Sequence, residues 1–300
     1  MNQSKGTVKA VQYSRSFGPF GSELCNFNRA GSSVVHLSYN YDHEPELGFW
    51  RGPISEAQFD ELVHRLHESH YDQLEVPSLQ YPGEFPLSIG ELREGEERPT
   101  SKSCPLDLPQ LKPVMQSIAD LMAEVRKNPV SVLRGQARWT TPELRQSPFE
   151  VQVTLENVGI EPFQLTHPGD TGQAALTVFF NAPNRVQRGL VVLGGADVID
   201  ATPAATGPAL VLAPGERLTF EARGRVPVVS EEYRGTLVFK SWVERGDGPA
   251  IQHRLDLDLG PVVVRPEAAN EENESLYPRP PDAPFQPPPR PMRYRSPRQP

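Results

Sequence analysis

The length, composition and charge of this 300-residue chain exclude several classes of protein. The net charge of −8 argues against a nucleic-acid binder that works by bulk electrostatics. Two cysteines, Cys25 and Cys104, are too few for a disulfide framework and suit a reducing compartment, although they leave a single bridge open. The polar N-terminus and the lack of a long apolar run predict a cytoplasmic protein without a membrane span or signal peptide.

Short strands are predicted in the first third of the chain, where β-branched and aromatic residues gather in four runs: 8–17, 23–29, 33–41 and 48–52. The third run alternates apolar with polar side chains, with Val35, Leu37, Tyr39 and Tyr41 on one face and His36, Ser38 and Asn40 on the other. A period of two is typical of a half-buried strand.

A helix over 56–72 is predicted by its start signals. Ser55 and Gln58 have the spacing of a capping box, in which each side chain bonds the other residue's amide. Ile54 and Phe59 occupy the two positions of a hydrophobic staple. Together these signals place the helix over 56–72, with both boundaries good to a few residues.

Residues 75–106 are rich in Pro, Gly and Glu and predict a loop with one short strand at most. A second helix is predicted over 110–127, because its apolar residues recur at steps of three and four: Leu111, Val114, Met115, Ile118, Leu121, Met122 and Val125. Asn128-Pro129 ends it.

Beyond residue 130 the helical period is replaced by short alternating runs, beginning with FEVQVTLENVG and ending with HRLDLDL. Turn residues separate the runs, as in Asn157-Val158-Gly159 and Pro214-Gly215. Seven or more short strands at this spacing predict an antiparallel β-sandwich.

Three segments of this region, PFEVQVTLENVGIEPFQL, LAPGERLTF and YRGTLVF, resemble bacterial immunoglobulin-like domains, including the intracellular proteinase-inhibitor type. The resemblance covers about 149–264 and rests on strands and turns. It implies a sandwich fold and no functional residue. The predicted fold class is therefore an α+β N-terminal domain (1–135), an all-β immunoglobulin-like sandwich (136–266) and a disordered Pro/Arg-rich tail (267–300).

Three histidines, His64, His67 and His70, lie three residues apart on the first predicted helix. Successive steps of about 100° spread them over about 120° of the helix surface, so they converge poorly on a metal ion. An amphipathic helix with boundary and exposed histidines is the main interpretation. The alternative is a metal-dependent enzyme in which His64 and His67 join His43 and the acidic loop 42–46.

The tail is the most plausible place for function. Residues 277–300 contain five arginines and one aspartate, a net charge of +4, which leaves −12 on residues 1–276. Proline at PxxP spacing followed by arginine favours docking in an SH3-like groove, and interleaved arginines favour an anionic surface or nucleic acid. The candidate partner-binding residues are Pro288, Arg290, Pro291, Arg293, Tyr294 and Arg295.

Nucleophile elbows, phosphate-binding loops and zinc-spaced cysteine pairs are missing from the sequence. The function expected is therefore that of a non-catalytic protein-binding protein without a cofactor, of which a bacterial inhibitor or immunity-type protein is one form. The partner would be another protein. A tail that tethers the chain to an anionic surface or nucleic acid is a further alternative.

Overall fold

The computed structural model describes residues 6–18, 21–39, 45–74, 87–104, 108–140, 143–144, 149–168, 176–181, 188–193, 197–202, 209–224, 232–243 and 251–264. All elements below belong to one compact unit, residues 1–265.

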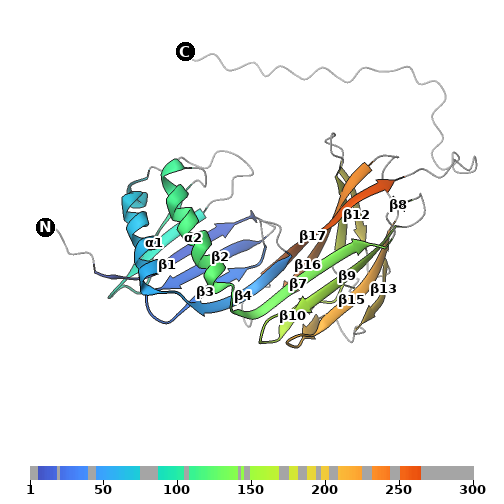
Figure 1. Ribbon diagram of the computed structural model, residues 1–300, viewed down its shortest axis with the longest axis horizontal. Coiled ribbons are helices and arrows are strands. Elements are labelled where there is room, and N and C mark those ends of the chain that lie inside the picture. Colours follow the sequence, from blue (N-terminus) through green and yellow to red (C-terminus); the bar gives the residue numbers. More distant parts are fainter. Residues whose placement is uncertain are drawn as a thin grey trace, which may run out of the picture. The chain divides into compact units, whose positions relative to one another are not determined.

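A ten-stranded sheet, called the large sheet, runs through this unit in the order β13-β15-β9-β7-β4-β3-β2-β1-β5-β6 (Figure 1). Neighbouring strands in it are antiparallel. Its strands are β1 (Val8–Ser16), β2 (Ser22–Asn28), β3 (Ser32–Leu37), β4 (Glu46–Pro53), β5 (Leu87–Arg93), β6 (Thr100–Cys104), β7 (Pro129–Trp139), β9 (Phe149–Asn157), β13 (Val198–Thr202) and β15 (Arg217–Gly224).

A second sheet has the order β12-β11-β16-β17-β8, and β10 pairs with β14 as a separate small sheet. The strands are β8 (Glu143–Leu144), β10 (Phe163–Thr166), β11 (Leu176–Asn181), β12 (Arg188–Leu193), β14 (Ala209–Leu212), β16 (Glu232–Val243) and β17 (Ile251–Val264). The short strand β8 runs parallel to the end of β17.

Two helices, α1 (Glu56–Glu68) and α2 (Lys112–Val125), lie across one face of the large sheet (Figure 1). Short 3-10 turns, η2 (Tyr71–Gln73) and η3 (Pro109–Leu111), follow α1 and precede α2. The predicted capping box is confirmed, because the Gln58 amide donates to Ser55 Oγ at 3.2 Å and the Ser55 amide donates to Gln58 Oε1 at 3.0 Å. The helix ends before the predicted residue 72, since His70 adopts a left-handed φ of 48°.

The large sheet has a different cover on each of its two faces. Under α1 and α2 lies a cross-strand row of buried side chains: Trp50, Val35, Cys25, Tyr13 and Ile89. On the opposite face, Leu47 and Leu133 belong to the core that the second sheet shares with β9 and β15. The helices therefore cover the first half of the large sheet on one side, and the second sheet covers the other half on the other side.

The predicted fold class, an α+β domain followed by an immunoglobulin-like sandwich, is wrong. The strands expected in each domain share one continuous sheet, joined where β4 pairs with β7. The position predicted to end the first domain, residue 135, falls inside β7. The molecule is mostly β, with one large sheet in place of two independent modules.

The segment 75–106 contains two strands, β5 and β6, in place of the loop that its composition predicts. Strand β5 pairs with β1, and β6 pairs with β5. In the described part of the chain, neither helix is long and apolar enough to cross a bilayer.

Candidate binding surface

One face of the first half of the large sheet is covered neither by the helices nor by the second sheet. We call it the open face. Because side chains alternate along strands, it carries the residues that do not point at α1 and α2. Two adjacent cross-strand rows form it, the first Phe49, His36, Leu24, Ser14, Ser88 and Ser103, and the second Arg51, Val34, Asn26, Gln12, Gly90 and Ser101.

A hollow of about 430 Å³ lies on the open face. Its lining combines His36 and neutral polar side chains with apolar ones. The polar residues are Gln12, Ser14, Asn26, Ser88 and Ser101, the apolar ones are Leu24, Val34, Phe49 and Pro99, and Tyr13, Cys25 and Gly90 complete it. Leu24 is 43% exposed, although its strand β2 lies in the middle of the six strands, β4-β3-β2-β1-β5-β6, that form the open face. Leu24 lines the hollow together with Val34 and Phe49, and apolar side chains grouped among hydrogen-bonding ones are a feature of contact surfaces.

Glycine deepens this hollow. A Cβ on Gly90 would lie 2.9 Å from the Cβ of Ser101 and 3.2 Å from that of Pro99. Beside it, Asn26 Oδ1 is a buried acceptor that has no hydrogen-bond partner among the described residues. The hydrogen-bonding side chains Gln12, Ser14, Ser88 and Ser101 line the hollow and suit it to a ligand with polar groups.

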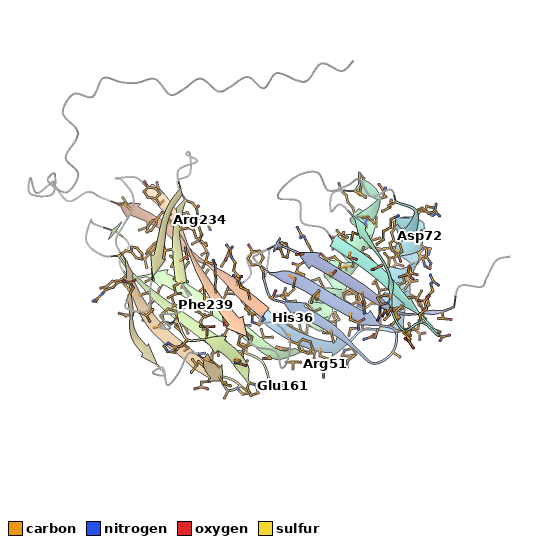
Figure 2. The ribbon with its side chains drawn as sticks, turned by 180° about the vertical axis from the view of Figure 1, so that it is seen from behind. His36, Arg51, Asp72, Glu161, Arg234 and Phe239 are labelled. Atoms are coloured by element: carbon orange, nitrogen blue, oxygen red, sulfur yellow. The ribbon has the colours of Figure 1, made fainter. Side chains whose placement is uncertain are left out.

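The second sheet closes one end of the open face, at His36 (Figure 2). The rings of His36 and His253 (β17) meet edge to face with centroids 5.8 Å apart, and His253 in turn lies 5.8 Å from the Phe163 ring. His253 is 8% exposed, so this end wall belongs to the core of the second sheet. The surface is thus a sheet face with an aromatic wall.

The open face lacks the geometry of a nucleophilic site. The cross-strand neighbours of His36 are Leu24 and Phe49, both apolar. Ser14 lies two strands away, a separation of about 10 Å at about 4.8 Å per strand, which is too far for an imidazole to accept its proton. In the part of the chain that the structure describes, no three His, Cys, Asp or Glu side chains gather in a way that could hold a metal ion.

Arg254 and Asp256, both on β17, form a buried ion pair that contacts Ser38 and Tyr39, the residues just after β3. Arg254 Nε and Nη2 contact the two carboxylate oxygens of Asp256 at 2.7 and 2.8 Å, and both side chains are largely buried. The Arg254 guanidinium also lies over the Tyr39 ring at 5.2 Å, and its backbone amide donates to Ser38 O at 2.8 Å. This contact fixes the end wall relative to β3.

The helix side of the same strands contains a buried thiol and a buried phenol. Burial raises the pKa of Cys25 well above its ordinary value, and the nearby Glu23 carboxylate raises it further. Burial is also the main cause of the raised pKa of Tyr13, whose hydroxyl donates to Glu23 Oε2 at 3.2 Å. Cys25 is free, so the disulfide that the sequence left open is absent.

Because the thiolate is the reactive form, we expect Cys25 in the native protein to resist iodoacetamide at pH 8. Unfolding in urea should restore ordinary reactivity. Peptide mapping by mass spectrometry follows Cys25 separately from Cys104. Rapid native-state alkylation of Cys25 would contradict the burial described here.

The three helix histidines do not converge. His64 lies 3.2 Å from Glu68 on the same helix and is 64% exposed. His67 Nε2 contacts Glu91 Oε1 at 2.9 Å. Glu91 lies near the C-terminal end of β5, is buried, and also pairs with Arg93. His70 lies beyond the helix end and is exposed. His67 therefore anchors α1 to the sheet.

Other predicted residues fall outside the described part of the chain. His43 and the rest of 42–44 are among them, while Glu46 of the same acidic run pairs with Arg134 and Arg126. The tail residues Pro288, Arg290, Pro291, Arg293, Tyr294 and Arg295 also lie outside, so their partner-binding role stays a prediction.

The residues of the open face were not singled out by the sequence. One signal was present, the polar face that alternation assigned to β3 through His36. Alternation identifies the two faces of a strand but does not show which face another element covers.

No protein-family model and no curated protein sequence matches this chain. Several solved structures share partial similarity. The ApaA protein of Bordetella pertussis is 15% identical with a TM-score of 0.24, over 47% of this chain and 99% of that one. The DNA glycosylase AlkC of Pseudomonas fluorescens is 9% identical with a TM-score of 0.25, over 52% and 38%. A β-glucosidase of Listeria innocua is 11% identical with a TM-score of 0.21, over 44% and 16%. Similarities at these TM-scores carry no argument about fold or function, so the open face must be interpreted from its own chemistry.

Proposed function

We propose that this protein binds another protein through the open face and acts by binding, without catalysis. The observation that supports the proposal most directly is Leu24, 43% exposed in the middle of a sheet face on which hydrogen-bonding side chains surround it and Val34 and Phe49 add apolar surface. Contact surfaces combine apolar anchors with polar groups and few charges at their centre. An inhibitor or immunity-type protein would need such a surface.

Leu24→Arg is the variant that tests this function, because it places a charge at the centre of the surface. The matched control is Val211→Arg on β14, where the wild-type side chain is 57% exposed and lies outside the open face. We expect Leu24→Arg to weaken partner binding at least tenfold, which corresponds to about 1.4 kcal/mol, and Val211→Arg to leave it unchanged.

The partner is first identified by a photo-crosslinking amino acid placed at Leu24 or at Val211 in the native host. Calorimetry with the purified partner then measures binding to wild type and to both arginine variants. Equal binding of the partner by wild type and Leu24→Arg would show that the partner does not bind through the open face. Turnover of a small substrate without any protein partner would overturn the binding function itself.

A further inference from the structure

A single charged side chain marks one corner of the open face. Arg51 stands opposite Val34 at the end of the second row, is exposed, and places its guanidinium 5.3 Å from the centre of the Phe49 ring (Figure 2). Stacking on an aromatic ring restricts the side chain, and because Arg51 is exposed its N–H groups remain available to a ligand. The arginine is therefore ordered before any ligand arrives.

Arg51 differs from most arginines on the described surface in contacting no carboxylate. Most others do, as in the pairs Arg29–Asp60, Arg217–Glu156, Arg223–Glu150 and Arg234–Asp258. The chain as a whole has a net charge of −8. Arg51 nevertheless places a positive charge that no carboxylate of the described residues neutralises beside the hollow.

The two rows of the open face contain no aspartate, glutamate or lysine. Arg51 and His36 are the only basic side chains in these rows. An incoming carboxylate would meet no opposing carboxylate there. A guanidinium binds such a group through two parallel charge-assisted hydrogen bonds. Beyond it, Gln12 and Ser101 of the same row line the hollow with neutral hydrogen-bonding groups.

Resting on the proposed function, we propose that the open face binds an extended segment of the partner that has one acidic side chain at Arg51 and is uncharged where it crosses Val34, Asn26 and Gln12. The second row runs over six strands, about 24 Å at about 4.8 Å per strand. About seven or eight extended residues, at about 3.3 Å each, cover that length. The specificity for one carboxylate at one end comes from the stacked arginine.

The probes are fluorescein-labelled pools of acetylated, amidated octapeptides, with Glu at the first or last position and mixtures of Ala, Leu, Ser and Asn elsewhere. Matched pools carry Gln or Lys in place of Glu. Fluorescence anisotropy with the full-length protein should show the better Glu pool binding about fivefold more tightly than its Gln counterpart, and the Lys pool more weakly than either. High salt should reduce this preference.

Arg51→Gln should abolish the preference for Glu and leave the affinity for the Gln pool unchanged. Equal binding of the Glu and Gln pools by wild type, or a preference that survives Arg51→Gln, overturns the acidic specificity. If the Gln pool binds equally well and this binding is lost in Leu24→Arg, the binding function stands and only the specificity fails. If none of the pools binds wild type, the proposal of an extended acidic segment fails, while the binding function is decided separately by crosslinking at Leu24.

Discussion

Replacing Gly48 with alanine should lower the free energy of unfolding by about 2–6 kcal/mol, because it strains the backbone of β4 and also forces a side chain into the backbone of β7. Gly48 has a φ of +134°, which strains any residue with a side chain, at about 1–3 kcal/mol. A Cβ there would lie 2.2 Å from Ser131 O and 2.9 Å from Val132 Cα. These are backbone atoms of β7, so only a shift of the strand can relieve the overlap, and overpacking adds about 1–3 kcal/mol.

Gly31→Ala is the control for backbone strain alone. Gly31 has a φ of +86° in the turn between β2 and β3, and a Cβ there would meet nothing within 4 Å. Urea denaturation followed by circular dichroism measures both variants. A Gly48→Ala protein as stable as Gly31→Ala would show that the approach of β4 to β7 is looser than described.

Asp256→Ala should be the second severe variant, at about 3 kcal/mol, because it removes the carboxylate that two nitrogens of the buried Arg254 contact. Losing one member of a buried ion pair leaves the other charge poorly solvated. The Tyr39 hydroxyl, 3.5 Å from Asp256 Oδ2, loses a neighbour as well. The variant should therefore loosen the end wall of the open face as well as destabilise the fold.

Asp258→Ala on the same strand is its matched control. Arg234 contacts Asp258 through the same two-pronged geometry, but the two side chains are 70% and 54% exposed. Hydrogen bonding from Arg234 is the main cause of the lowered pKa of Asp258, yet a solvent-screened pair adds little to stability. Thermal denaturation should separate the two variants clearly, and similar melting temperatures would contradict the burial of Arg254–Asp256.

Local signals predicted the local structure well. The start of α1 follows from Ser55 and Gln58, whose reciprocal bonds depend on residues three apart. The apolar period of α2 places Val114, Ile118 and Leu121 in the core, where the structure has them. The strands that alternate strongly, such as β9, were found for the same reason.

Long-range pairing accounts for most of what the sequence could not show. Strand β7 was missed because two of its positions that face the second sheet, Gly135 and Ala137, are small. A Cβ on Gly135 would lie 2.4 Å from Leu255 Cδ2, so the partner sheet fills the space that a large side chain would mark in the sequence. Strand β5 was hidden within a segment rich in Pro, Gly and Glu, and its partner β1 is distant in the chain. With these strands unseen, two domains were predicted where one sheet is continuous.

The pairing of β4 with β7 has a consequence for how the chain is made. A nascent chain synthesised as far as Val125 contains both helices and β1 to β6. One edge of β4 is still unpaired at that point, because its neighbour β7 begins only at Pro129. Unpaired N–H and C=O groups along a strand edge recruit other strands. The edge of β4 therefore stays unpaired until β7 has been synthesised and pairs with it. A chain whose synthesis stops just after α2 would be prone to aggregate through β4.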